Sequence, residues 1–465
     1  MLKNKVFKYK KTLLAGAVFA LFCLSSGLLL SSCGSTDKIP VVEEETVEDF
    51  TVRNLSNGIP VVFKQNRGSK IVVLRLVFEG GCSSLDKSVS GIENLTLDLA
   101  LQGSADYSYE KIQQLEYEKS FSLSAESGKD YSTAGFICIQ RDLAEVFDIF
   151  AGCMISPTFS EEEFKRRMTE EADSISRKKA DPSGALGIAM TKTVFKDHPY
   201  ATTASITEDS YKNINMNLVR GLHQSLMNAL RIKIVVVGNF SNSLIDDFTG
   251  ELESRFGGIS RKAFSLPKIP KISVGQETVK VANEQAGDTG YIAGIFECPS
   301  KDSDDYIPFA IASMYIDDLF FSQVREQAGA VYSINTGVIG GKEMAGVISV
   351  YRASAKNQLK SLICGAISSF DASLVEKKLD QYKNKYISMI FNASQTASGL
   401  AANVVSSMEY FGSESAYMHR AEKIRMVDAQ QVVAAYKKYF EPLATENAAC
   451  WIVVDSEKNL KEYDF

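Results

Sequence analysis

The chain has 465 residues, with 51 Lys and Arg against 57 Asp and Glu, and 45% of its residues are hydrophobic. This composition is typical of a folded globular protein and excludes a disordered chain, a collagen and a protein with many membrane spans. The net charge of −6 leaves no surplus of basic side chains to neutralise phosphates, so nucleic acid is a poor partner. Because a single core stops growing at about 250–300 residues, we expect at least two domains.

The N-terminal segment has the features of an export signal. Five lysines between positions 3 and 11 precede an apolar stretch that ends at Leu30, and small residues then lead to Cys33. This ending resembles the lipobox of bacterial lipoproteins, in which the cysteine is acylated. We therefore expect residues 1–32 to be a lipoprotein signal peptide, Cys33 to be the lipidation site and residues 33–49 to be an acidic tether. The expected location is the bacterial cell envelope, with the chain anchored by lipid; an ordinary signal peptide is the alternative.

Beyond this tether the chain contains one pattern twice. The apolar run from Ile71 matches the run from Thr289, and the run from Arg231 matches the run from Asn447, both at an offset of about 217 residues. We expect the following division: a first domain over residues 50–256, a linker over 257–280 and a second domain over 281–465. The linker is proposed because it contains glycine and prolines and lacks helical periodicity.

Each repeat has strand and helix patterns in the same order. The first repeat predicts a helix through Ile92, Leu95 and Leu99, strands within 121–127 and 130–140, and helices over 142–155 and 160–179. The second predicts a helix over 311–319, strands within 330–338 and 345–353, and helices over 356–370 and 374–391. Strands interspersed with helices make each domain α/β (α+β), with helices packed on a sheet.

Three blocks carry a resemblance to a known family. They are GIENLTLDLALQGS at 91–104, VFKDHPYATTASI at 194–206 and FSQVREQAGAVYSINTG at 321–337. With the two-domain order, they resemble the insulinase/pitrilysin family of zinc metallopeptidases over almost the whole chain after the tether. The likeness is in particular to short bacterial members and to mitochondrial processing peptidase subunits, which work as pairs of two-domain chains around a chamber. The resemblance implies two homologous domains that form half of a clamshell chamber.

Active members of that family carry an H-x-x-E-H motif on the first helix. Its two histidines hold Zn²⁺, and its glutamate activates the bound water. In this chain the resemblance places Asn94 and Asp98 at the histidine positions and Leu97 at the glutamate position. An amide is a poor zinc ligand and a leucine cannot accept a proton, so the motif is degenerate.

The third family ligand is a glutamate on the long helix of the first domain. Our register places Ser174 at this position, and a slip of three or four residues would place Glu171 or Glu170 there instead. We expect this chain to bind no metal and no other cofactor.

The histidine count supports this expectation. The chain has 3 histidines, His198, His223 and His419, and no two are four residues apart, so no helix presents a zinc-binding pair. The resemblance assigns His198 to a structural turn, and we expect the other two to be surface or packed histidines. No cysteine after the tether lies in a C-x-x-C pair, which favours structural thiols.

The second domain matches another family feature. In the family, an arginine and a tyrosine seven residues apart hold the substrate carbonyl and stabilise its developing oxyanion, and Arg325 and Tyr332 have this spacing. Such preorganised donors can stabilise a transition state. The alternative is an arginine that binds carbonyls at a helix end and a tyrosine that packs in the core.

These observations predict the zinc-lacking subunit of a heterodimeric metallopeptidase, inactive alone, which supplies Arg325 and Tyr332 in trans to a zinc-bearing partner. The resemblance implies unfolded peptide substrates that pair with an exposed sheet edge, here near residues 124–127. The alternative is a catalytically inactive pseudopeptidase that acts as an envelope scaffold or peptide-binding module. A lone active peptidase would require a metal site that no spacing in the sequence indicates.

Overall fold

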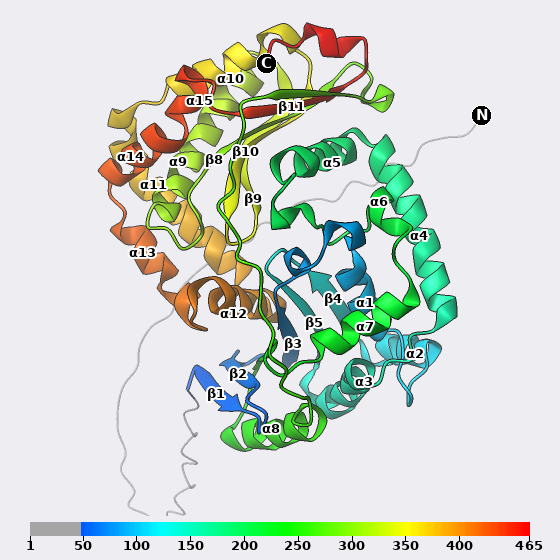
Figure 1. Cartoon of the computed structure of the whole chain (residues 1–465). Coiled ribbons are helices and arrows are strands. Elements are labelled where there is room, and N and C mark those ends of the chain that lie inside the picture. Colours follow the sequence, from blue (N-terminus) through cyan, green and yellow to red (C-terminus); the bar gives the residue numbers. More distant parts are fainter. Residues whose placement is uncertain (1–47) are drawn as a thin grey trace, which may run out of the picture. The chain divides into compact units, whose positions relative to one another are not determined.

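The computed structural model describes residues 48–465, which belong to one compact unit, Thr46–Phe465. The expected signal peptide, Cys33 and most of the expected tether lie outside the described residues. Two sheets and the helices around them make up this unit (Figure 1). None of the helices in residues 48–465 has the length and hydropathy of a membrane span.

The first sheet has six strands in the order β1-β2-β6-β3-β5-β4. These are β1 (Phe50–Asn54), β2 (Pro60–Gln65), β3 (Ile71–Glu79), β4 (Ser122–Ser127), β5 (Tyr131–Ile139) and β6 (Ile232–Gly238). Strand β3 pairs antiparallel with both β5 and β6, and β4 pairs with β5 at the edge. The strand expected near residues 124–127 is therefore confirmed, and it is an edge strand.

The second sheet has five strands in the order β7-β11-β8-β10-β9. These are β7 (Thr278–Ala282), β8 (Gly290–Glu297), β9 (Val331–Gly340), β10 (Met344–Ala353) and β11 (Cys450–Asp455). Strand β8 lies between β11 and β10, antiparallel to both, as β3 lies between β6 and β5 in the first sheet. The repeat found in the sequence is therefore a repeat of sheet topology.

The helices of the first half are α1 (Ile92–Ala100), α2 (Tyr109–Lys119), α3 (Leu143–Ile155), α4 (Glu161–Ala180), α5 (Pro182–Val194), α6 (Glu208–Tyr211), α7 (Met216–Leu226) and α8 (Asn242–Phe256). The Ser160 hydroxyl caps α4, whose first turn is acidic and whose last turn is basic, as the helix dipole favours. Asp181 then caps α5, and Pro182 at its first position stops α4 from continuing. The helices predicted over 142–155 and 160–179 are confirmed as α3 and α4.

The helices of the second half are α9 (Tyr306–Leu319), α10 (Leu359–Ser368), α11 (Ala372–Ala393), α12 (Ala397–Phe411), α13 (Arg420–Met426), α14 (Ala429–Tyr439) and α15 (Glu441–Thr445). Three of them, α9, α10 and α11, confirm the helices predicted there. Between α8 and β7 the chain has no helix or strand. Because β7 begins at Thr278, the last residues of the expected linker, 278–280, belong to the second sheet.

Two helices cross from one half to cover the sheet of the other (Figure 1). Leu186 of α5 packs with Ile295 and Ile452 of the second sheet. Reciprocally, Val404 of α12 packs with Val235 and other residues of the first sheet. The opposite face of each sheet packs on helices of its own half. The central strands of both sheets are therefore buried on both faces, which is why β6 and β11 are almost continuously apolar.

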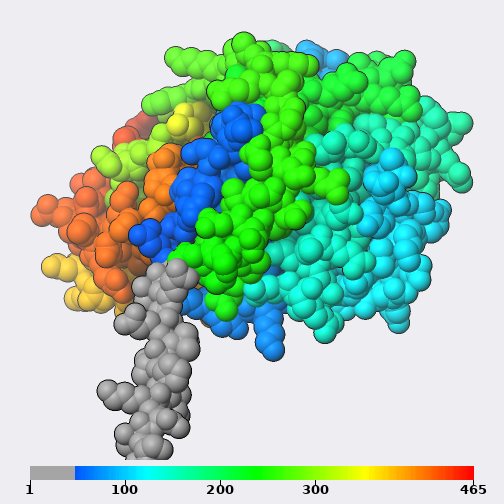
Figure 2. Space-filling model, turned by 90° about the horizontal axis from the view of Figure 1, so that it is seen from below, coloured from blue at the N-terminus to red at the C-terminus, as the bar shows by residue number. Residues whose placement is uncertain are grey.

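The first strand adds a further contact between segments that are distant in sequence. Phe50 at the start of β1 packs edge-on against Tyr417, with ring centroids 6.4 Å apart. Arg53 of the same strand forms an ion pair of 3.0 Å with Asp246 of α8. In Figure 2 the blue segment that contains β1 accordingly lies between an orange segment of the second half and the green segment that contains α8.

The reciprocal packing predicts that the two halves unfold together. Leu186 is 4% exposed, and Leu186→Ala is expected to lower the free energy of unfolding by about 2–4 kcal/mol because it removes a buried side chain. The chain's single tryptophan, Trp451, is buried in the second half and reports on that half. Urea unfolding followed by its fluorescence and by far-UV circular dichroism is expected to give one shared transition that shifts in the variant.

Leu374→Ala, at an exposed leucine, is the control and is expected to change stability by less than about 0.5 kcal/mol. A Trp451 transition that Leu186→Ala leaves in place would show that the halves unfold independently.

Candidate functional site

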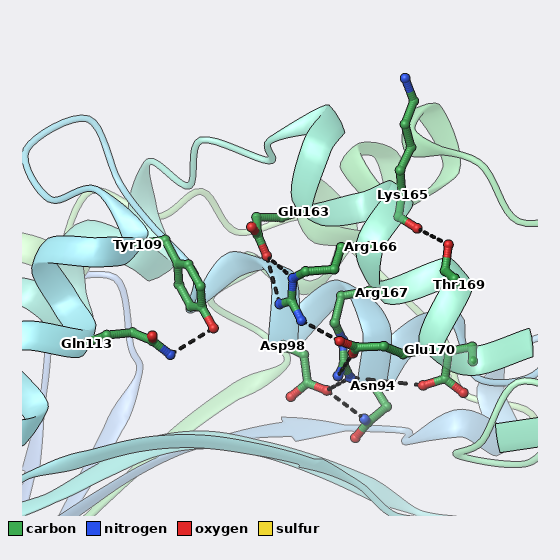
Figure 3. A network of polar contacts seen from close by, with 11 residues as sticks. Asn94, Asp98, Tyr109, Gln113, Glu163, Lys165, Arg166, Arg167, Thr169 and Glu170 are labelled. Carbon is green, nitrogen blue, oxygen red and sulfur yellow. Dashed lines mark hydrogen bonds and ion pairs between the residues drawn. The ribbon is translucent and has the colours of Figure 1, made fainter. Parts of the chain in front are cut away.

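Helix α1 presents Asn94 and Asp98 on one face, because the two residues are four positions apart. Asn94 Nδ2 donates to Asp98 Oδ2 at 3.1 Å (Figure 3). Asn94 Oδ1 accepts a hydrogen bond from the backbone N–H of Ser127, the last residue of β4, at 3.1 Å. The degenerate motif therefore ties α1 to the edge strand of the first sheet.

Arg167 of α4 lies against this pair. Its Nη2 donates to Asp98 Oδ2 at 3.1 Å, and its Nη1 donates to Glu170 Oε2 at 3.2 Å (Figure 3). Glu171 lies 3.9 Å from the same Nη2. A guanidinium is thus bound by side chains at or beside the positions that hold zinc in the family. Arg167 was not singled out from the sequence, although its place one turn before Glu171 on a predicted helix was the available signal.

The other two predicted motif positions lie elsewhere. Leu97 is fully buried in the core of the first half, where it belongs to the same apolar cluster as Phe136. Ser174 lines a cavity together with Lys178. Within residues 48–465, no hydrogen bond joins Ser174 to Arg167. Of the candidates for the third family position, the structure brings Glu171 to Arg167, and the assignment of that position to Ser174 stays a prediction.

Burial governs the electrostatics of the site. It raises the pKa of Asp98 above its usual range, the charge of Arg167 partly opposes this rise, and the charge of Glu171 adds to it. The pair of Asp98 and Arg167 is about three-quarters buried, with side chains 26% and 25% exposed. Because a half-solvated carboxylate pair repels itself, the guanidinium is what keeps Asp98 and Glu171 compatible at neutral pH.

These residues do not fit a zinc ion. The donor set is an amide and a carboxylate that is already bound to a guanidinium, and Leu97 offers no proton acceptor. Within residues 48–465, no group of three or more His, Cys, Asp and Glu side chains is placed to hold a metal. His223 is buried with Nε2 2.9 Å from the Met154 carbonyl, and His198 Nε2 lies 2.9 Å from the Pro270 carbonyl. No step of a reaction is therefore assigned to a zinc ion on this chain.

Arg325 and Tyr332, in contrast, lie together. Arg325 is on a π-helical segment, Phe320–Gln327, with its Cζ 5.2 Å from the Phe321 ring centroid and 5.8 Å from that of Tyr332. Arg352 Cζ, from a bulge in β10, lies 5.9 Å from the Tyr332 ring. Arg352 has a left-handed backbone, with φ of 54°. π-Helical turns and strained residues of this kind are concentrated at functional sites.

Tyr332 is 67% exposed. The alternative, in which this tyrosine packs in the core, is therefore wrong. The Arg325 side chain is 42% exposed and lies 3.6 Å from Glu326. Donors that face water contribute little to an oxyanion, since the high dielectric weakens their field. The catalytic role of the pair stays a prediction, and it requires another surface to cover the two side chains.

Comparison with known protein families identifies the family to which this chain belongs. The insulinase (peptidase family M16) description matches residues 60–208, and the peptidase M16 inactive domain description matches residues 213–386. The chain belongs to the insulinase (M16) peptidase family. Among curated relatives, it is 22% identical over 308 residues to the uncharacterized zinc protease YmxG of Bacillus subtilis. The aligned region covers 66% of this chain and 74% of that protein. It is 19% identical to the non-peptidase homolog YmxG of Helicobacter pylori, over 39% of this chain and 42% of that one.

Solved structures show the same M16 fold. An M16 inactive domain from Pseudomonas fluorescens superposes with a TM-score of 0.75 at 16% identity, over 88% of this chain and 98% of that one. The periplasmic protease PqqL of Escherichia coli superposes with a TM-score of 0.73 at 14% identity, over 89% of this chain and 46% of that one. This M16 chain therefore spans less than half the length of PqqL.

The first prediction from the site concerns the charge that Arg167 supplies. Arg167→Met is expected to lower the free energy of unfolding by about 1–3 kcal/mol at pH 7, because it leaves Asp98 and Glu171 without their cation. The loss is expected to shrink as the pH falls, since burial raises the pKa of Asp98 and its carboxyl then becomes neutral. Urea unfolding at pH 7 and at pH 4 measures it.

In the double variant Arg167→Met/Asp98→Asn, part of the lost stability is expected to return. The exposed Arg425→Met is the control and is expected to have an effect below about 0.5 kcal/mol. A full loss that persists at pH 4 would contradict the electrostatic explanation.

The second prediction concerns the third family position. Asn94→His/Asp98→His is expected to bind zinc poorly while Arg167 is present, and at least about tenfold more tightly when Arg167→Ala is added. Equilibrium dialysis with metal analysis measures this. In the triple variant, Glu171→Ala is expected to weaken zinc binding and Ser174→Ala is not. The reverse order of these two effects would assign the third position to Ser174.

Proposed function

We propose that this chain is the zinc-lacking subunit of a two-chain M16 peptidase and that it supplies Arg325 and Tyr332 to the active site of a zinc-bearing partner. One contrast carries the proposal. In the first half, a guanidinium is bound at the family's zinc positions, whereas in the second half the arginine and the tyrosine lie together on an exposed surface. Within residues 48–465 the chain has donors for a reaction, but no group of His, Cys, Asp and Glu side chains is placed to hold a metal that would activate water.

The lengths of the relatives support a missing second chain. This chain covers 46% of PqqL and 45% of the ferredoxin protease FusC, although it covers nearly all of the Pseudomonas M16 domain. Two chains of this size have about the length of one long protease. A partner would also cover Tyr332 and Arg325 and exclude water from them, and the field of a fixed cation is much stronger in such a low-dielectric site.

The chemistry assigned to the pair is oxyanion stabilisation. As water adds to a peptide carbonyl, its oxygen becomes negative, and the Arg325 guanidinium and the Tyr332 hydroxyl can donate hydrogen bonds to it. Phe321 and Arg352 flank these groups and limit the positions that they can take. The pair therefore contributes positioning and charge, and the partner contributes the nucleophile.

The substrates that we propose are unfolded peptides. An extended peptide can add to a sheet edge through main-chain hydrogen bonds, and β4 is an edge strand on which the N–H groups of Leu123 and Ser127 already donate to Glu116 and Asn94, so a peptide would have to displace these two side chains. Its side chains alternate between exposed and partly buried positions, as a peptide-binding edge requires. We also propose that the chain is a lipoprotein of the cell envelope, anchored through Cys33, on the basis of the sequence that precedes this cysteine.

A second candidate function is that of a pseudopeptidase, which binds peptides or acts as an envelope scaffold without contributing to catalysis. The name of the Helicobacter relative, a non-peptidase homolog, favours this possibility. In that case Arg325 and Tyr332 would have no catalytic effect in any mixture.

Reconstitution separates the two functions. We expect no peptidase activity from Thr46–Phe465 alone, and activity on an unfolded peptide when it is mixed with an H-x-x-E-H relative from the same cell. Arg325→Ala is expected to lower kcat/KM of the mixture by about 100–1,000-fold, and Tyr332→Phe by about 10–100-fold, as for the loss of oxyanion donors. Fluorogenic peptide cleavage measures both.

Arg425→Ala, on the exposed surface of α13, is the matched control and is expected to leave the activity unchanged. Size-exclusion chromatography of each mixture reports whether the complex forms. A complex whose activity survives both Arg325→Ala and Tyr332→Phe would exclude the catalytic role and favour the scaffold.

A further inference from the structure

The first half contains a cavity of about 730 Å³ that the proposed function does not use. It lies between α4, α5, the turn Lys87–Val89 and the segment 201–213. A volume of this size is typical of pockets that hold small organic ligands. The cavity is lined by more apolar than polar surface, and its apolar side chains include Ile175, Ile188 and the buried Ile206.

The opening of the cavity is basic. Six exposed lysines line it against three carboxylates, a surplus of three positive charges on a chain whose net charge is −6. The lysines are Lys87, Lys178, Lys179, Lys192, Lys196 and Lys212, and the carboxylates are Asp86, Glu208 and Asp209. A local surplus of this kind attracts anions to one place on an acidic protein.

Most of these ammonium groups lack a fixed partner. Among the residues that the structure describes, only Lys179 of the six forms an ion pair, at 2.9 Å from Glu208. The hydrogen bond from Lys179 and the charges of Lys192 and Lys212 hold the pKa of Glu208 below its usual range. Glu208 is therefore paired with Lys179, whereas Lys192 and Lys212 act on it only through their charge, so their ammonium groups remain available to a ligand.

The hydroxyl groups of the lining are less available. Thr191 Oγ1 donates to the Gly187 carbonyl at 3.1 Å, and Thr203 Oγ1 donates to the Ser205 carbonyl at 2.7 Å. Ser90 Oγ donates to the Lys87 carbonyl at 2.9 Å. Because these protons are already used, the lysines are the main polar groups that a ligand meets, and they select a negative charge.

We infer that this cavity binds a small amphiphilic anion, an apolar chain that ends in a carboxylate, of the fatty-acid class. The apolar chain would fill the floor at Ile175, Ile188 and Ile206, and the carboxylate would lie among Lys192 and Lys212. An inorganic anion would leave the floor unfilled. A lipid surface requires apolar side chains that project from the protein, whereas these are recessed behind the lysines.

The experiment uses Thr46–Phe465, which contains both sheets and every buried cluster described above. Isothermal titration with dodecanoate below its micellar concentration is expected to show one site per chain. Dodecanol and sulfate, which each carry only half of the required chemistry, are expected to bind at least about tenfold more weakly. Equal binding of dodecanol would overturn the inference.

Variants locate the site. Lys192→Glu/Lys212→Glu is expected to weaken dodecanoate binding at least tenfold, and Ile188→Asp similarly, because a carboxylate then faces the ligand chain. Glu208→Gln, which removes a competing negative charge, is expected to strengthen binding about two- to fivefold. Lys437→Glu, at an exposed lysine of α14, is the control and is expected to change nothing.

Three further results would overturn the inference: equal weakening by Lys437→Glu, weaker binding in Glu208→Gln, or no dodecanoate binding at about 1 mM, near the weak limit of specific binding. Binding to vesicles of phosphatidylglycerol without binding of free dodecanoate would indicate a membrane contact instead. Binding of hexaglutamate without dodecanoate would indicate a peptide site. Circular dichroism of each variant confirms that it is folded.

Discussion

The fold depends on the reciprocal burial of the two sheets. Each sheet has two apolar faces, and its own helices cover only one of them. The other face of the second sheet packs on α5 from the first half, and the other face of the first sheet packs on α12 from the second half. Because exposing either face would place a continuous apolar surface in water, the halves cannot separate without a large loss of hydrophobic stabilisation. The repeat in the sequence thus produces two mutually dependent halves.

At the degenerate zinc motif, the positive charge of Arg167 balances the negative charges of Asp98 and Glu171. Asp98 of α1 and Glu171 of α4 both lie beside Arg167, and the charge of Glu171 acts unfavourably on the partly buried Asp98 carboxylate. In an active relative a metal dication supplies the opposing charge. Here a guanidinium supplies it, with donors directed at Asp98, Glu170 and Glu171. The contact between α1 and α4 is therefore satisfied without a metal, and loss of the zinc site does not require loss of the fold.

Much of this was predictable from the sequence, for identifiable reasons. Local sequence patterns predicted many elements: the helical period predicted α3, α4 and α11, and apolar runs predicted β3 and β8. Because the chain contains the pattern twice, each half supported the prediction made for the other. The resemblance of the block around Arg325 and Tyr332 to the family predicted that the two residues lie together, which their spacing alone does not. The packing of α5 on the second sheet was not predictable, because its apolar face is the same whichever sheet it covers. The contacts of Arg167 with Asp98 and Glu171 depend on how α4 is rotated against α1, which tertiary packing decides.

The remaining question is why Arg325, Tyr332 and Arg352 are arranged as they are. Exposed cation–π contacts contribute about 0.5–1 kcal/mol each. A non-glycine residue in the left-handed region, such as Arg352, costs of order 1–3 kcal/mol. The π-helical turn that carries Arg325 is a rare distortion as well. The cluster also leaves the Tyr332 ring mostly in water. Its three cation–π contacts are therefore of the same order as the cost of the strained residue in the isolated chain. A chain or a substrate that covered this surface would strengthen the contacts, because cation–π attraction rises to about 2 kcal/mol or more when the groups lose their water.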